Sequence, residues 1–273
     1  MEPGPRSASQ AGLRLGRGAG PGLLLFARYA YPPNELGYCG AEDHRALLEY
    51  GAGGVVDPGL AQLARGFHGA WPYLELIAAA TGVGDPLDAR VVEAYWVGNP
   101  LLDRVDLTAF GSSLEDRFRR RAGRSWERLA ETIPAGGVAH HSFHVFCVYP
   151  WVGLLGADGA GGQPLHVLDR CRIRWGQVVT AEQDTVVVRS RPLLWDGRQL
   201  DLGPPRPEAA TRAVDGLAFV GDLRPGQWVS LHWGWVCDRL TPRQLGALRA
   251  HTARTLAMTN RRLAHPGPAA VLG

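Results

Sequence analysis

The segment Gly156-Ala-Asp-Gly-Ala-Gly-Gly-Gln163 divides this sequence into two parts with different hydrophobic patterns. Its glycines and small side chains favour a flexible linker. Before the segment, apolar residues recur at three- and four-residue spacing, which is typical of amphipathic helices. After it they alternate with polar residues, which is typical of β-strands. The sequence therefore predicts an α+β protein, with an all-helical domain followed by a smaller β domain.

The upstream part predicts several short helices. Some of their starts are marked by an acidic residue followed by proline, as in Asp57-Pro58 and Asp85-Pro86. Proline interrupts regular structure, so Tyr31-Pro-Pro-Asn34 is expected to form a turn. The apolar stretch His141–Leu155 fits either a buried helix or a strand interrupted by Pro150. The predicted helices are Asp43–Tyr50, Pro58–Phe67, Trp71–Thr81, Pro86–Val97, Ser113–Arg121 and Ser125–Thr132.

The downstream part predicts short strands and one final helix. Asp196-Gly197 indicates a tight hairpin, because both residue types tolerate positive φ. Thr241-Pro242 is an N-cap followed by proline and opens a helix that extends to about Arg262. Short strands followed by one helix predict a small OB-like β-barrel with a C-terminal helix. The predicted strands are Leu165–Asp169, Arg172–Thr180, Thr185–Arg191, Leu193–Trp195, Gln199–Leu202, Ala218–Leu223 and Gln227–Cys237.

These patterns predict five segments along the chain. Residues 1–22 are expected to be a disordered leader, 23–156 the helical domain and 157–164 the linker. Residues 165–264 are expected to hold the barrel and its helix, and 265–273 a tail.

Composition excludes several functional classes. The chain contains no lysine, so its 29 basic side chains are all arginine, which rules out P-loop and Schiff-base lysine chemistry. A net charge of +3 is too small to suggest nucleic-acid binding. No signal peptide and no membrane-spanning stretch is recognisable. The four cysteines form no C-x-x-C pair. We expect a cytoplasmic protein with reduced thiols, without nucleic-acid or membrane partners.

Four pieces of the downstream part carry a resemblance to a known family. Cys171-Arg-Ile-Arg-Trp-Gly176-Gln-Val178 has the spacing of a motif that begins with cysteine and continues to Pro-Gly-x-Val. A hairpin follows around Asp184. Gly226-Gln-Trp-Val-Ser-Leu-His232-Trp-Gly-Trp235 then matches Gly-Asp-Trp/Tyr-Val-Leu-Val-His-x-Gly-Phe, and Leu240-Thr-Pro-Arg-Gln-Leu245 leads into the final helix. In this order, residues 165–264 resemble the HypC family of hydrogenase-maturation chaperones.

The resemblance implies a fold, a function and two site residues. HypC proteins are small OB-like barrels that escort an iron carrying cyanide and carbonyl ligands. They act with a HypD partner and deliver this iron unit to the large subunit of nickel–iron hydrogenase. The essential family cysteine corresponds to Cys171 and the histidine of the second motif to His232. The helical part resembles an uncharacterised actinobacterial family over Tyr29–Gly40 and Ala94–Asn99.

The residues themselves support part of this interpretation. Alternation along the strand that contains His232 places this residue opposite the more apolar face, where we expect it to be reachable. Arg170, Arg172 and Arg174 surround Cys171 and are expected to lower the pKa of its thiol. Thiolate and imidazole are suitable ligands for iron. The alternative for Cys171 is an inert buried cysteine, and the alternative for His232 is a hydrogen-bonded structural role.

A second candidate site lies in the helical part. On a helix, His140 and His144 share a face, as do His144 and Cys147, which makes a row of metal ligands. The leading hypothesis is a two-domain maturation chaperone that carries the iron unit on Cys171 and His232. The alternatives are a metal-dependent iron enzyme of the same pathway that uses His140, His144 and Cys147, and a scaffold without metal.

Overall fold

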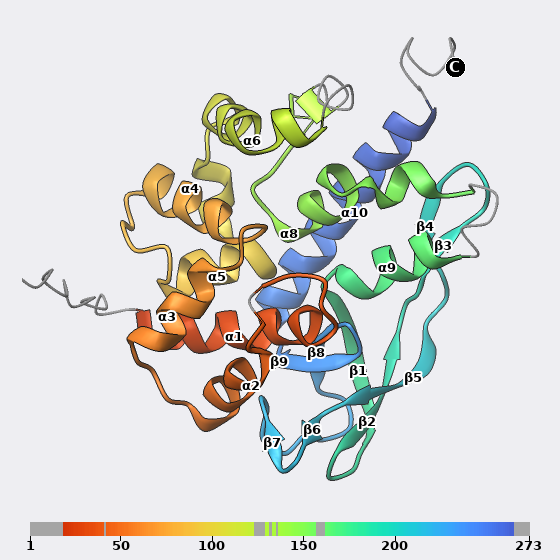
Figure 1. Cartoon of the computed structure of the whole chain (residues 1–273). Helices are drawn as coiled ribbons and strands as arrows, with labels where there is room; N and C mark the ends of the chain where they lie inside the picture. The colour runs from red at the N-terminus through yellow and green to blue at the C-terminus, as the bar shows by residue number, and fades with distance from the viewer. Residues whose placement is uncertain are drawn as a thin grey trace, which may run out of the picture.

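The computed structural model describes residues 19–40, 42–122, 129–130, 133–134, 136–156 and 162–264. The helices of the first half lie beside a group of twisted strands (Figure 1). The long C-terminal helix α10 contacts α8 of the helical half and β1 and β4 of the strand half. The predicted α+β class is confirmed.

Helices occupy most of the first half of the chain. Within the described residues, the α-helices are accompanied by two 3-10 helices, η1 and η3, and one π-helical turn, η2. The bounds are α1 Ala19–Glu35, α2 His44–Gly53, α3 Pro58–Arg65, α4 Trp71–Thr81, α5 Ala89–Trp96, η1 Pro100–Arg104, α6 Leu107–Ala122, α8 His141–Phe143, η2 His144–Val148, η3 Pro150–Leu154, α9 Gln163–Cys171 and α10 Pro242–Ala264.

Five strands pair in the order β1-β2-β5-β9-β8, and β8 pairs back with β1, so the ring of pairings closes. All neighbours are antiparallel except β5 and β9, which join in parallel at Thr211 and Trp235. Two small hairpins, β3-β4 and β6-β7, lie outside this ring. The bounds are β1 Arg174–Ala181, β2 Thr185–Ser190, β3 Leu193–Trp195, β4 Leu200–Leu202, β5 Arg206–Thr211, β6 Ala213–Val214, β7 Leu217–Ala218, β8 Trp228–His232 and β9 Trp235–Arg239.

Local capping signals explain where several helices begin. Asp57 accepts the amide of Leu60 and Pro58 is the first residue of α3, as predicted. Thr241 caps α10 in the same way through the amide of Gln244. The predicted start at Asp85 is wrong, because Asp85 instead accepts the amide of Leu87 in a turn, and α5 begins after Asp88.

The predicted strand Leu165–Asp169 is wrong, because these residues lie in α9. Pro164, Val167, Leu168 and Cys171 are its buried residues. Their spacing of three, one and three residues is the period of one helix face. Gln163 and Pro164 begin the helix, so the linker expected to reach residue 164 ends before them. Residues 157–161 lie outside the described part.

The predicted turn Tyr31-Pro-Pro-Asn34 is also wrong, since it forms the last part of α1. Two consecutive prolines near a helix end are tolerated because the groups they leave unpaired can find other partners. The helix begins at Ala19, so residues 19–22 of the expected leader are helical. Residues 1–18, the tail 265–273 and most of Ser125–Thr132 lie outside the described residues.

The helical and strand halves share one buried core. Helix α1 contacts both β8 and β9. Tyr31 packs edge-on against Trp235 with ring centroids 5.0 Å apart, and the Tyr29 hydroxyl donates to Ser230 at 2.8 Å. The face of β8 that carries Ser230 and His232 is therefore covered by α1. Among the described residues no helix combines the length and apolar character needed to cross a membrane.

Candidate metal centre

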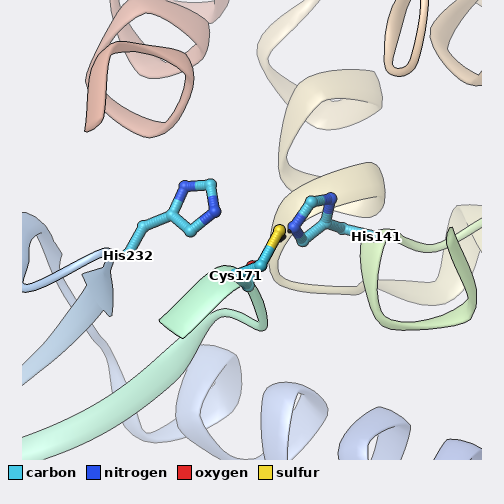
Figure 2. Close-up of side chains that lie close together, drawn as sticks. All are labelled: His141, Cys171 and His232. Carbon is cyan, nitrogen blue, oxygen red and sulfur yellow. Dashed lines mark hydrogen bonds between the residues drawn. The ribbon is translucent and has the colours of Figure 1, made fainter. Parts of the chain in front are cut away.

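Three side chains from distant parts of the chain meet in the core. His141 begins α8, Cys171 ends α9 and His232 ends β8. Each offers one ligand atom, and these atoms all lie within 4.8 Å of one another. The three residues are at most 6% exposed. Figure 2 shows the two imidazole rings on either side of the Cys171 sulfur. The structure thus joins the two residues predicted from the sequence and adds a third.

Backbone contacts hold Cys171 and His232 together. Helix α9 ends at Cys171, where the chain turns into extended backbone before β1. The amide of Trp233, in the β8–β9 turn, donates to the Arg170 carbonyl at 2.9 Å. Trp233 (φ 49°) and Gly234 (φ 87°) are both left-handed, as in the favoured two-residue hairpin turns. This conformation is uncommon for a bulky side chain. The hydrogen bond from Trp233 to Arg170 attaches this turn to the end of α9. His232, the residue before the turn, is therefore placed beside Cys171.

The hydrogen bond of His232 defines its free nitrogen. Nδ1 lies 2.7 Å from the Tyr29 carbonyl oxygen, which only accepts, so Nδ1 carries the proton. In the neutral ring, Nε2 is then an unprotonated acceptor. It is buried and has no hydrogen bond of good geometry among the described residues, although the Cys171 backbone carbonyl lies near enough to raise the pKa of the ring. A buried polar atom without a partner is costly. A metal ion at this nitrogen removes that cost.

His141 is held by two hydrogen bonds. Its Nε2 donates to the Cys171 carbonyl at 2.8 Å, and its Nδ1 accepts from the Tyr95 hydroxyl at 3.2 Å. To ligate a metal through Nε2, the ring must move its proton to Nδ1 and leave the carbonyl. The Tyr95 hydroxyl accommodates this change, because a hydroxyl both donates and accepts. His141 is therefore the ligand that exchanges a protein contact for the metal.

Burial sets the protonation of the three residues. It raises the pKa of the Cys171 thiol far above the ordinary value, and nearby Cys39 raises it further. Burial lowers the pKa of His141 to about 4 and also lowers that of His232. At neutral pH the site without metal holds a thiol and two neutral imidazoles. The expectation that surrounding arginines lower the thiol pKa is therefore wrong.

The three arginines near Cys171 have carboxylate partners. Arg172 pairs with Asp169 at 2.8 Å, whereas Arg170 and Arg174 both pair with Glu208. Arg172 and Arg174 are each 1% exposed. Buried charges need such partners. The arginines thus belong to an ion-pair network between α9, β1 and β5, rather than serving as free positive charges for the thiol.

Aromatic side chains enclose the centre. The Trp96 ring lies 4.6 Å from the His141 ring and 5.7 Å from the His232 ring, between centroids. Tyr38 stacks on Trp233 at 4.3 Å. His232 was expected to be reachable, but it is 1% exposed because α1 and Trp96 cover that face of β8. The site is shielded from water by both halves of the chain.

The ligands predicted in the helical part, His140, His144 and Cys147, lie outside the three-residue centre and contact other residues. His140 caps α8 by accepting the amide of Ser142, and its ring stacks on His251 at 4.6 Å. His144 contacts the Tyr73 hydroxyl at 3.1 Å. Cys147 lies near Thr259 and Arg262 of α10. Helical spacing relates these three residues to one another and does not include His141. The sequence does contain one signal for His141, namely the adjacent pair His140-His141. His140 caps α8, whereas His141 points toward the barrel side.

One thiolate and two imidazoles form a suitable ligand set for a transition metal of intermediate softness, such as iron, cobalt or zinc. Three protein ligands leave at least one position for an additional group, as in sites where chemistry or transfer occurs. The convergence of one ligand atom from each of the three residues within 4.8 Å is the observation that favours a ligand set over a packed polar cluster.

Metal binding is expected to release one proton, because the ligand is the thiolate and the thiol of Cys171 stays protonated without metal. The imidazoles are already neutral and release none. Apparent affinity for Co²⁺ should therefore rise about tenfold per pH unit at neutral pH. Calorimetry in two buffers of different ionisation enthalpy counts the released protons. A count of zero would contradict ligation by Cys171.

Comparison with known proteins identifies the family. The family of unknown function DUF6390 matches residues 18–266. This region includes both halves of the chain and all three residues of the candidate metal centre. No curated protein and no solved structure shows significant similarity to the chain. The match spans most of the sequence, and the chain therefore belongs to the DUF6390 family.

Proposed function

We propose that this protein carries a metal-containing unit during the maturation of nickel–iron hydrogenase, with Cys171 and His232 as ligands. One observation carries the proposal: the two residues that match the HypC signatures, although far apart in the sequence, lie within ligand distance of one another. A cargo held by both residues requires this proximity, and the spacing of the two motifs along the chain does not by itself provide it.

The third residue gives the helical half a part in the proposed function. His141 comes from α8 and completes a set of ligands to which both halves contribute. A carrier with such a site holds its cargo away from water and oxygen until the protein opens. The cargo would be an iron with cyanide and carbonyl ligands, and a thiolate is a suitable ligand for soft iron of this kind. A HypD-like protein and the hydrogenase large subunit would be the partners.

Infrared spectroscopy tests the proposal directly. The protein is produced anaerobically together with the maturation proteins, its iron is measured, and the region of cyanide and carbonyl stretches is recorded. We expect both bands in the wild type and neither in Cys171→Ser. Cys147→Ser is the matched control, because Cys147 is equally buried but lies outside the three-residue centre; it should keep the bands.

Two results would overturn the proposal. Wild-type protein without iron or without these bands would exclude a carrier of this cargo. Iron that persists in Cys171→Ser but is lost in His144→Ala would point instead to an enzyme with a metal in the helical half.

A further inference from the structure

The two prolines of α1 lie in the sequence Tyr29-Ala-Tyr-Pro32-Pro33. In a regular α-helix, the carbonyl of residue i accepts the amide of residue i+4. For Tyr29 that residue is Pro33, which has no amide hydrogen. The Tyr29 carbonyl consequently lacks its helical donor. Pro33, which the sequence places in a predicted turn, thus leaves a buried acceptor without a helical donor on the side of α1 that packs against β8.

His232 takes the place of the missing donor. Its Nδ1 lies 2.7 Å from the Tyr29 carbonyl oxygen, and both groups are buried. The same contact holds the imidazole in the tautomer with its lone pair on Nε2. Metal-binding histidines usually donate their second ring N–H to a carbonyl or carboxylate, and this partner fixes the ring and its tautomer. The Tyr29 carbonyl has this role here before any metal arrives.

The Tyr29 side chain anchors the same segment. Its hydroxyl donates to Ser230, two residues before His232 on β8, and its ring stacks on Trp96 at 5.6 Å. Residue 29 is therefore attached to β8 through both side chain and backbone. The carbonyl has little freedom to move away from the imidazole.

We propose that Pro33 is a positioning residue of the metal centre: by withholding an amide hydrogen, it reserves the Tyr29 carbonyl for His232 and so presents Nε2 to the metal. This inference rests on the metal-binding part of the proposed function, and not on the identity of the cargo. Pro33 touches no ligand atom and acts only through the carbonyl.

Pro33→Ala and Pro32→Ala form a matched pair of variants. Both replace a proline of the same helical segment by alanine, a better helix former. Pro33→Ala supplies an amide to the Tyr29 carbonyl, whereas Pro32→Ala supplies one to the Arg28 carbonyl. No hydrogen bond of the described residues joins the Arg28 carbonyl to the three ligands. If the prolines served only to shape α1, the two variants would behave alike.

The first readout needs no metal. In metal-free protein labelled with ¹⁵N-histidine, the long-range ¹H–¹⁵N spectrum reports which nitrogen of His232 is protonated. We expect the Nδ1–H tautomer in the wild type and in Pro32→Ala, and a mixture with Nε2–H in Pro33→Ala. An Nε2–H tautomer in the wild type would overturn the inference, even if Pro33→Ala failed to fold.

The second readout is affinity for Co²⁺, followed by the charge-transfer absorption of a cobalt–thiolate bond. Loss of an outer partner typically weakens metal binding 10- to 100-fold. We expect about a tenfold loss in Pro33→Ala, because a carbonyl has two lone pairs and can still be shared, and no loss in Pro32→Ala. Equal affinity and an equal tautomer in both variants would overturn the inference. Failure of Co²⁺ to bind the wild type, with the expected tautomers, would count against the metal-binding function alone.

Discussion

Metal-free protein should lose much of its folding stability as the pH falls from about 6.5 to about 4. The cause is a group of four histidines that are at most 5% exposed: His140, His141, His144 and His232. Burial is the largest cause that lowers the pKa of each one. A solvent-exposed imidazole in the unfolded chain becomes protonated in this range, whereas the buried ring does not.

The direction of this change in stability follows from the number of protons that the folded and unfolded states bind. Between these pH values the unfolded chain binds more protons than the folded protein, so the free energy of unfolding decreases as the pH falls. For His141 the folded pKa of about 4 lies below an ordinary value of 6.5. This difference corresponds to about 3 kcal/mol of stability that is present above pH 6.5 and lost by pH 4. The other three histidines act in the same direction. Total stabilities of about 5–15 kcal/mol are usual, so the combined loss is large.

Urea unfolding at several pH values between 7 and 4.5 measures this dependence. His141→Gln should flatten the curve, because glutamine keeps a donor for the Cys171 carbonyl but does not titrate. His68→Gln, which removes an exposed histidine, is the control substitution. Stability that is constant over this range, or equal slopes in the wild type and His141→Gln, would contradict the prediction.

Glu208→Gln should destabilise the fold by about 3–5 kcal/mol, the usual cost of removing one partner of a buried ion pair. Glu208 lies on β5 and accepts from Arg174 of β1, Arg170 of α9 and the Ser190 hydroxyl. The guanidinium of Arg174 is 1% exposed. Loss of the carboxylate charge leaves this cation in the core without its ion-pair partner.

The matched control is Glu49→Gln, since Glu49 pairs with Arg45 at the surface, where the side chains are 59% and 49% exposed. Exposed pairs contribute about 0–1 kcal/mol. Urea unfolding at pH 7 compares the two variants. In the double variant Glu208→Gln with Arg174→Met, part of the lost stability should return, because the unpaired charge is gone. A loss below about 1 kcal/mol in the free energy of unfolding of Glu208→Gln would contradict the prediction, because the ion pairs of Glu208 would then contribute little to stability.

Local signals in the sequence were sufficient for the fold class and several element boundaries. The helix starts at Asp57-Pro58 and Thr241-Pro242 were predicted correctly, because capping depends on residues within one turn. The errors also have local causes. Pro32 and Pro33 predict a turn, but they lie within the end of α1. The sequence pattern predicts a strand at Leu165–Asp169, but the buried positions of this segment follow the helical period.

The candidate metal centre follows partly from the sequence and partly from the tertiary structure. The sequence by itself determined the α+β class and singled out Cys171 and His232, because their motifs are contiguous and their spacing can be read directly. Only the tertiary structure decided the third residue, His141, and the Tyr29 carbonyl that orients His232. It also reversed the expected effect of the arginines, whose charges are taken up by Asp169 and Glu208. The physical reason is common to these cases: burial and contacts between residues far apart in the chain set ligand geometry and pKa, and no local pattern encodes either one.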